Sequence, residues 1–156
     1  MNQGWIYRDR IPAAAIGQTL LDYYTQRYRH SSRAAWQQRI EAGQVTVDEV
    51  LGLAEQPLQP GQHLAYHRPP WPEPAVPLAF AVLYEDDDFL AIAKPSGLPV
   101  LPGGGFLEHT LLHQLRQRYD EPRLSPVHRL GRGTSGVMLW ARSPLAKSEL
   151  SRQMRR

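Results

Sequence analysis

The sequence contains no cysteine. This absence excludes disulfide bonds, a thiol nucleophile and any zinc site built from thiolates. A bound metal ion would therefore need histidine and carboxylate ligands. Among the six histidines, His109 and His113 form a helical i,i+4 pair, but the glutamate of a His-Glu-x-x-His motif is missing beside them. We expect no metal site.

Long hydrophobic runs are also absent. The first residues, MNQGWIYRDR, contain no apolar segment of the kind found in a secretory signal, and no later stretch approaches the roughly 20 apolar residues that a membrane span requires. Apolar residues make up 42% of the chain and charged residues 21%, which is typical of a globular rather than a disordered protein. We therefore expect a soluble, cytoplasmic protein with no membrane partner.

The formal net charge is only +3, but the positive charge is unevenly distributed. From Arg116 onward, arginines and one lysine greatly outnumber the acidic residues, which are Asp120, Glu121 and Glu149. Basic side chains neutralise phosphates and release counterions, so this distribution favours a nucleic-acid partner. A solvated basic surface explains the charge equally well, and charge alone does not separate the two interpretations.

The N-terminal part of the chain has the pattern of two helices. Thr19–Tyr28 places its apolar residues at helical spacing, which predicts an amphipathic helix. Ser31 and Ser32 offer N-cap oxygens to a second helix, predicted at Arg33–Glu41. Gly43 lies just beyond and predicts the left-handed residue that ends this helix.

A small sheet is predicted after the helices. Val45, Val47 and Val50 mark short strands, and a Pro-Gly turn leads into a last strand at His63–Tyr66. We therefore assign residues 1–66 to one small α/β module.

The segment SSRAAWQQRIEAGQVTVD resembles the core of the S4 RNA-binding fold. The usual asparagine-glycine turn after the valine pair is replaced by Asp48 and Glu49. The resemblance implies an S4-like RNA-binding module that contacts RNA through Arg33 and Arg39. The alternative is a helical hairpin with a sheet and no nucleic-acid role.

A proline-rich segment follows at residues 67–77. It contains five prolines and cannot sustain a helix or a central strand. Proline also keeps such a segment extended and fairly stiff. The sequence therefore predicts a linker between residues 1–66 and a second unit at residues 78–156.

The second unit is predicted to begin with a hairpin of two strands, Phe80–Tyr84 and Phe89–Ala93, joined by an acidic turn. A proline- and glycine-rich loop follows, and Thr110–Tyr119 has the leucine spacing of a helix. Val137–Ala141 predicts a buried strand. The fold class expected for the whole chain is α+β.

Three segments of this unit occur in the order found in the large-subunit type A (RluA-like) RNA pseudouridine synthases. VLYEDDDFLAIAKPSGLPV, residues 82–100, resembles the opening block of that family, with two strands, an acidic turn and a lysine-proline-x-glycine loop. LPGGGFLEHTLLHQL, residues 101–115, resembles the loop and helix that follow. PVHRLGRGTSGVMLWARS, residues 126–143, resembles the block with the active-site loop. The chain is identified as a member on these three segments together.

The resemblance implies that residues 78–156 are the N-terminal part of a mixed-sheet catalytic domain. The family's catalytic domain normally runs well beyond the third block, so this chain looks truncated. A sheet left incomplete would expose unpaired edges and an apolar face, which predicts marginal stability or association.

In the third block the family pattern is histidine, arginine, leucine, aspartate, then x-x-threonine-serine-glycine. Here the sequence is HRLGRGTSG, and Gly131 occupies the place of the aspartate. In the family this aspartate acts on the ribose or the base of uridine, and covalent or proton-transfer help is what carboxylates supply. Glycine can supply neither. Activity of this chain is therefore in question.

The resemblance implies roles for other residues of the loop. Arg129 would contact RNA and help to fill the space left when the target uridine leaves the stack. Its alternative is a structural arginine bonded to nearby carbonyls. Arg132 is a second candidate RNA contact. The residues that would structure the loop are His128, Thr134, Ser135 and Gly136.

Another carboxylate could replace the missing one. The candidates are Asp86, Asp87, Asp88, Glu108 and Asp120, and for all of them solvated surface is the favoured interpretation.

Two functions remain open. The first is an RNA pseudouridine synthase, an isomerase that needs no cofactor. The second is a catalytically silent RNA-binding protein of the same family, which the glycine favours. In either case the resemblance implies an RNA partner, ribosomal RNA rather than transfer RNA, because S4-like modules usually accompany ribosomal substrates. A protein with no RNA partner would require the three segments to match by coincidence. The oligomeric state and the target uridine are not encoded in these residues.

Overall fold

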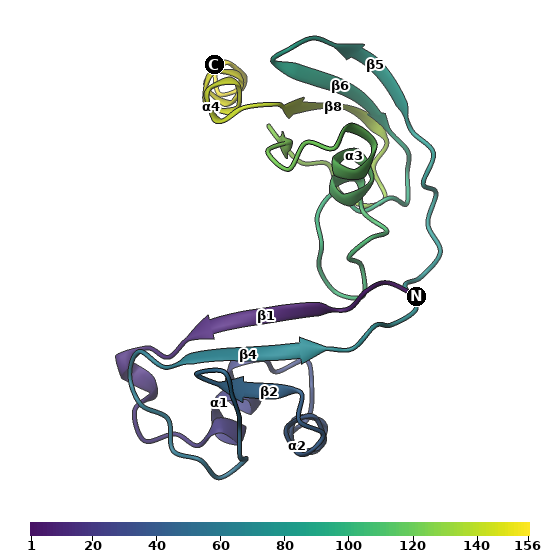
Figure 1. The fold of residues 1–156 in the computed structure, drawn as a ribbon. Coiled ribbons are helices and arrows are strands. Elements are labelled where there is room, and N and C mark those ends of the chain that lie inside the picture. The colour runs from purple at the N-terminus through teal and green to yellow at the C-terminus, as the bar shows by residue number, and fades with distance from the viewer. The chain divides into compact units, whose positions relative to one another are not determined.

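A computed structural model describes residues 1–156, which form two compact units. One unit comprises Gln3–Trp71, and the other comprises Met1–Asn2 together with Pro72–Arg156. Each unit contains a four-stranded sheet in which all strand pairs are antiparallel, and the chain has four α-helices (Figure 1). The predicted α+β class is therefore confirmed, although no parallel strand pair contributes to either sheet.

The first unit contains the following elements: β1 (Trp5–Arg10), the 3-10 helix η1 (Ala13–Ala15), α1 (Leu20–Arg27), α2 (Arg33–Glu41), β2 (Val45–Val47), β3 (Val50–Leu51) and β4 (His63–Arg68). Its strand order is β1-β4-β2-β3. Both helices lie on the same side of this sheet (Figure 1). The sequence did not predict β1, because none of its six residues is buried and it therefore lacks an apolar periodicity.

Side-chain caps determine where the two helices begin. Thr19 Oγ1 accepts the N–H of Asp22 at 3.1 Å, and Ser32 Oγ accepts the N–H of Ala35 at 3.1 Å. Gly43 beyond α2 has a φ of 76°, the left-handed value that a helix stop requires. The predicted limits of α2 are confirmed at both ends.

Aromatic rings form much of the core of this unit. The ring of Trp36, which is 2% exposed, lies 4.6 Å from the ring of Tyr24 and 5.1 Å from that of Tyr66, measured between centroids. Rings at such separations contribute more than the apolar area they bury. This cluster joins α1, α2 and β4.

The second unit contains β5 (Ala81–Glu85), β6 (Phe89–Lys94), α3 (Leu111–Tyr119), β7 (Ser125–Pro126), β8 (Gly136–Ala141) and α4 (Pro144–Met154). Its strand order is β5-β6-β8-β7. The helix α3 covers one face of the sheet (Figure 1). The fully buried side chains of this core include Leu90, Ile92, Leu111, Leu115, Met138 and Trp140.

The helix α4 was not predicted from the sequence. It begins after Ser143, whose Oγ accepts the N–H of Ala146 at 3.1 Å, and has proline in its first turn. These are ordinary start signals. However, none of its residues is buried, so the apolar stripe that identifies a helix in a sequence is weak.

The proline-rich segment predicted as a linker is divided between the units. His67 and Arg68 are the last residues of β4, whereas the chain from Pro72 onward belongs to the second unit. Val76 packs against the core of that unit. Residues 72–77 therefore have a defined place in the second unit.

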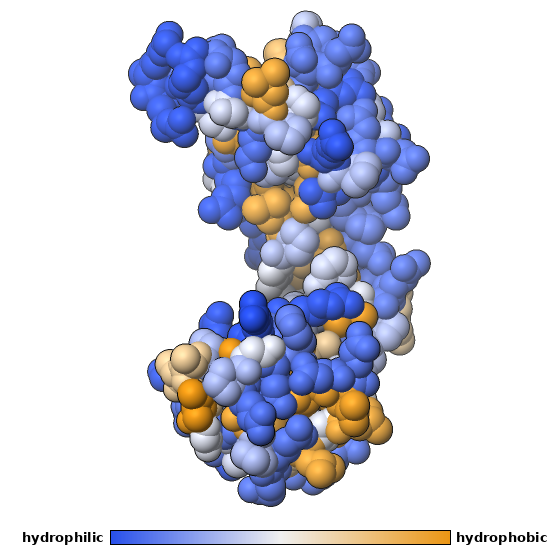
Figure 2. Space-filling view, turned by 60° about the vertical axis from the view of Figure 1, so that its left-hand side comes forward, coloured by the Kyte–Doolittle hydropathy of each residue, from blue (hydrophilic) through white to orange (hydrophobic).

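The surface of both units is mainly hydrophilic, with separate hydrophobic groups between the polar ones (Figure 2). On the sheet of the second unit, Leu83 and Val137 are each 55% exposed. None of the helices combines the length and the apolar character needed to cross a bilayer.

The turn between β2 and β3 carries backbone strain. Asp48 has a φ of 48° and Glu49 a φ of 68°, and these two residues alone join the paired residues Val47 and Val50. Two positive φ values in a two-residue hairpin loop define a type I′ turn, which favours asparagine and glycine. The Asp48 carboxylate accepts the N–H of His63 at 2.9 Å, which gives that residue a structural role that Glu49 lacks.

Replacing Glu49 with glycine should stabilise the first unit. A non-glycine residue in the left-handed region costs about 1 kcal/mol, and the greater freedom of glycine in the unfolded chain offsets part of that gain. We expect Glu49→Gly to raise the free energy of unfolding by about 0.5 kcal/mol in urea titrations followed by tryptophan fluorescence. The control is Glu55→Gly, at an exposed position without positive φ, which should destabilise. Equal effects at both positions would refute the strained turn.

Candidate active-site loop

The segment HRLGRGTSG, residues 128–136, forms a loop that leads from β7 into β8. Its last residue, Gly136, is the first residue of β8 and pairs with Lys94 at the end of β6. The loop is therefore next to the lysine-proline-x-glycine segment that follows β6. Two of the three sequence blocks meet at this point.

Lys94 is hydrogen-bonded to the loop at residues 128–136. Its ammonium Nζ donates to the carbonyl oxygens of Pro95 (2.9 Å), Arg132 (3.0 Å) and Thr134 (2.7 Å). The residue is 2% exposed, and burial lowers the pKa of its ammonium group. No carboxylate pairs with it. Its charge is thus compensated by carbonyl dipoles.

Two further hydrogen bonds join the same segments. The N–H of Gly97 donates to the carbonyl oxygen of Arg132 at 2.7 Å, and Ser96 Oγ donates to that of Gly133 at 2.8 Å. Gly97 has a φ of 98°, which only glycine adopts readily. The residues 94–97 and 132–134 therefore form one hydrogen-bonded structure.

The backbone at Gly131 does not require glycine. Its φ is outside the left-handed region, and an added Cβ would meet only Thr134 Oγ1, at 3.5 Å, an ordinary contact. Gly133 likewise has no unusual φ and open space around it. Neither Gly131 nor Gly133 therefore has a backbone conformation that is closed to other residues. Gly136, with a φ of 153°, does have such a conformation.

The polar residues of the loop differ in their contacts. His128 Nε2 accepts the N–H of Leu139 on β8 at 3.1 Å. The N–H of Thr134 donates to the carbonyl oxygen of Gly131 at 3.0 Å and closes a turn. Ser135 is exposed and its side chain makes no hydrogen bond. The loop is thus held by backbone groups more than by its hydroxyls.

Two exposed arginines flank the position of the missing aspartate. Arg129 is exposed and forms no ion pair or hydrogen bond. Arg132 is also exposed, and its guanidinium Cζ lies 5.3 Å from the centroid of the Phe106 ring. Together with the buried ammonium of Lys94, they make this region positive, which favours the approach of an anionic partner.

A second charged residue anchors the loop before α3. The carboxylate of Glu73 accepts the N–H groups of Leu107 (2.5 Å), Glu108 (2.9 Å) and His109 (3.0 Å), and also the side-chain amide of Asn2 (3.0 Å). Burial alone would raise the pKa of the Glu73 carboxyl, but the three N–H groups and the Asn2 amide lower it to about 2. Residues 107–109 are thereby fixed beside Phe106.

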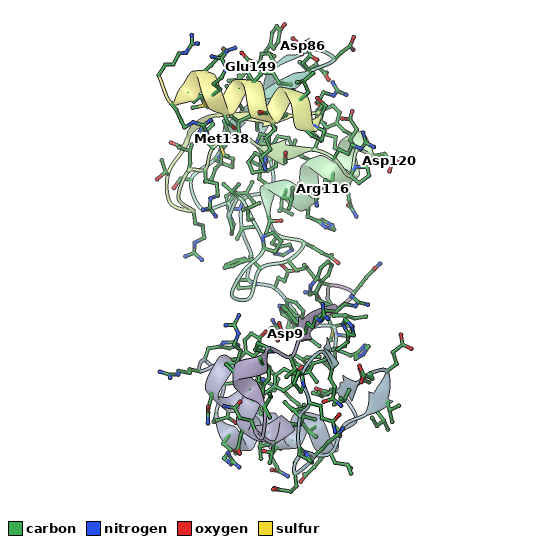
Figure 3. The ribbon with its side chains drawn as sticks, turned by 90° about the vertical axis from the view of Figure 1, so that its left-hand side faces the viewer. Asp9, Asp86, Arg116, Asp120, Met138 and Glu149 are labelled. Carbon is green, nitrogen blue, oxygen red and sulfur yellow. The ribbon has the colours of Figure 1, made fainter.

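The acidic turn lies at the opposite end of β6 from the loop. Asp86 accepts the N–H groups of Asp88 and Phe89 at 2.8 and 2.9 Å, at the start of the strand that ends with Lys94. Five residue steps in a strand span about 16 Å. Asp86 and Asp120 lie at the top and right margins of the second unit in Figure 3.

Of the carboxylates considered from the sequence, Glu108 is the nearest along the chain to Phe106, whose ring centroid lies 5.3 Å from the guanidinium Cζ of Arg132. No comparable contact connects the acidic turn or Asp120 with the loop. Among the described residues, no group of three or more histidine and acidic side chains could hold a metal ion.

In the first unit, the two arginines expected to contact RNA have different surroundings. Arg33 Nη1 donates to Asp22 Oδ1 at 2.6 Å, whereas Arg39 lies over the rings of Trp36 and Tyr66, with its Cζ 4.5 and 5.4 Å from their centroids. Six residues along a helix place side chains roughly 120° apart around the axis. The two guanidinium groups therefore do not belong to one cluster.

Lys94, Ser96 and Glu73 were not predicted as site residues from the sequence. For Lys94 the sequence does contain a signal. Lys94 lies two residues after Ile92 and four after Leu90, so in a strand it points to the same face as these two apolar residues, and that face is buried. Ser96 belongs to the lysine-proline-x-glycine segment and has no periodicity to identify it. Glu73 lies in a proline-rich segment, where nothing in the sequence indicates its partners.

The chain matches a family model described as RNA pseudouridylate synthase over residues 88–156. It is 57% identical over 136 residues to an uncharacterized RNA pseudouridine synthase of Synechocystis, a match that covers 87% of this chain and 47% of that protein. It is 42% identical over 164 residues to RNA pseudouridine synthase 5 of Arabidopsis thaliana, covering 97% of this chain and 44% of the relative.

A third relative is the ribosomal large subunit pseudouridine synthase D of Xylella fastidiosa, 32% identical over 158 residues, with 97% of this chain and 48% of the relative covered. The chain thus spans about half the length of the curated relatives it matches. The similarity includes both units of the structure.

The contacts of Glu73 predict a pH-dependent stability of the second unit. A carboxyl whose pKa is near 2 in the folded state and near 4.5 in the unfolded state stabilises the fold above pH 4.5 and loses this effect as the pH falls toward 2. We expect Glu73→Gln to lower the free energy of unfolding by about 1–3 kcal/mol at pH 7, measured by urea unfolding followed through the amide signals of α3.

The difference between the unaltered chain and Glu73→Gln should shrink as the pH falls below 4.5. The control is Glu55→Gln, an exposed residue of the first unit, which should change stability by less than about 0.5 kcal/mol. A difference that stays constant between pH 7 and pH 2 would contradict this role of the Glu73 charge.

Proposed function

Because the chain belongs to the RNA pseudouridine synthase family, we propose that it acts on RNA in the isomerisation of uridine to pseudouridine. The observation that carries the proposal is the joint structure of residues 94–97 and 132–134. Two family segments far apart in the sequence are fastened to each other there through Lys94, Ser96 and Gly97. A loop fixed in this way offers a preorganised site for a reacting nucleotide.

The isomerisation has defined chemical needs. The bond between N1 of uracil and C1′ of ribose breaks, the base turns, and C5 bonds to C1′. C5 then loses its hydrogen as a proton and N1 gains one, so the reaction needs no oxidant and no cofactor. A positioned carboxylate can assist bond cleavage or proton transfer.

At residue 131 this chain has no carboxylate. We assign the best remaining position to Glu108, because the loop that contains it contacts Arg132 through Phe106. Its backbone N–H donates to the Glu73 carboxylate at 2.9 Å, which fixes the backbone position from which the Glu108 side chain extends.

The RNA contacts follow from charge and exposure. Arg129 and Arg132 are exposed beside residue 131, where a cation can fill the space of an extruded base. In the first unit, which we assign as an S4-like RNA-binding module, Arg33 and Arg39 supply further cations. We propose ribosomal RNA as the substrate, and the relative named for the large ribosomal subunit supports this choice over transfer RNA. The site of action would be the cytoplasm.

A second candidate function is RNA binding without isomerisation. Gly131 favours it, since the loop keeps its hydrogen bonds and its exposed arginines while lacking the family's carboxylate. The two candidates share an RNA partner and differ only in chemistry.

The test is release of tritium from ribosomal RNA labelled at C5 of uridine. We expect Gly131→Asp to release tritium about 100-fold faster than the unaltered chain, because the backbone accepts the side chain and one positioned acid or base contributes about 10²–10⁴-fold. The matched control is Gly133→Asp, which adds the same charge two residues away in open space and should not raise the rate.

The unaltered chain then separates the two candidates. Release that Glu108→Gln abolishes supports the isomerase with Glu108 as its carboxylate. No release, combined with binding of the same RNA, supports the binding-only protein. Failure of the unaltered chain to bind RNA better than a neutral polymer at low salt would overturn both.

A further inference from the structure

A hollow of about 430 Å³ opens on the first unit. Its walls come from the second half of α2, from β4 and from the segment Pro69–Trp71 that follows β4. The volume is in the range of sites that hold one small organic group. The loop at residues 128–136 contributes none of its lining.

Two arginines give the hollow its charge. Arg39 and Arg68 both line it, and no acidic residue does. Neither guanidinium belongs to an ion pair. Arg39 Nη1 donates to Ser31 Oγ at 3.0 Å, and Arg68 Nη1 donates to the Tyr7 hydroxyl at 3.3 Å. Both guanidinium groups are thus oriented by neutral oxygens, and no carboxylate pairs with them.

Aromatic rings and guanidinium groups lie close to one another around this hollow. The Cζ of Arg68 lies 3.5 Å from the centroid of the Trp71 ring, and Arg39 lies 5.4 Å from that of Tyr66. The ring of Tyr66 is itself stacked on that of Tyr7, with centroids 5.9 Å apart. Aromatic faces and guanidinium planes are the surfaces on which unpaired bases stack.

The remaining polar groups of the lining can read a base edge. Gln38 and Gln44 each supply an amide, which offers both donors and an acceptor. An acidic peptide would use the two cations but not the flat faces, and a free phosphate would leave the rings unused. A nucleotide is the chemical group that would use all three.

We propose that this hollow binds one unpaired nucleotide of RNA, with the base stacked at Trp71 and Arg68 and the neighbouring phosphate held by Arg39. The inference rests on the proposed function in taking RNA as the partner, and it names the part of the RNA that the first unit recognises. Stacking tolerates every base, so this contact selects single-stranded over paired nucleotides rather than a sequence.

The test measures binding of a short labelled oligouridylate to the full chain at low salt by fluorescence anisotropy. Trp71→Leu keeps an apolar side chain but removes the ring, and Arg68→Gln removes the charge. We expect each to weaken binding about tenfold, because stacking of one base contributes about 1–3 kcal/mol. Both residues are partly exposed, so folding should survive, which circular dichroism would verify.

Arg8→Gln is the matched control for charge. Arg8 is an exposed arginine on β1 that does not line the hollow, and its loss should weaken binding by no more than about twofold, since it removes a general attraction only. An abasic ribose-phosphate oligomer of the same length should bind the unaltered chain about tenfold more weakly than oligouridylate and should not respond to Trp71→Leu.

Equal affinity for the abasic oligomer and the oligouridylate, or a Trp71→Leu variant that binds as well as the unaltered chain, would overturn the inference. Structured ribosomal RNA, tested beside the oligomers, separates this failure from that of the proposed function. If the unaltered chain binds structured RNA and Trp71→Leu has no effect, only the proposed nucleotide site is refuted. If the unaltered chain binds no RNA at all, both the nucleotide site and the proposed function are refuted.

Discussion

The second unit depends on the burial of one positive charge. Placing an ammonium group in a protein interior without a counterion is costly unless its hydrogen bonds are fully satisfied. Lys94 meets this condition with three backbone carbonyl oxygens at 2.7–3.0 Å, one from its own segment and two from the loop at residues 128–136. The lysine can stay charged only if that loop has the observed conformation. Burial of the Lys94 charge therefore favours the observed conformation of this loop.

Glu73 provides the same arrangement with the opposite charge. Its carboxylate is satisfied mainly by three consecutive backbone N–H groups, as Lys94 is satisfied by carbonyls. In both cases the charge is balanced mainly by backbone dipoles and not by a side chain of opposite charge. As a consequence, the exposed arginines Arg129 and Arg132 are not consumed in internal ion pairs and remain available to phosphates.

The elements with an apolar face could be predicted from the sequence. The limits of α2 follow from Ser32 and Gly43 together with the buried residues between them, and β6 follows from its apolar residues, which are alternately buried. By contrast, β1 and α4 bury no residue fully and lack a clear apolar pattern. The segment pattern located the loop but not its anchors, because the partners of Lys94 and Glu73 are backbone atoms that any residue could supply. The absence of strain at Gly131 is likewise a property of the backbone alone.

Lys94 holds the loop that would form the active site. Amide hydrogen exchange, measured by NMR on the unaltered chain and on Lys94→Met, tests it most directly. We expect the amides of Gly97 and Thr134, which are hydrogen-bonded within this structure, to exchange at least about 100-fold faster in the variant. The amides of β4 in the first unit should keep their rates. Unchanged exchange at Gly97 and Thr134 would contradict the claim.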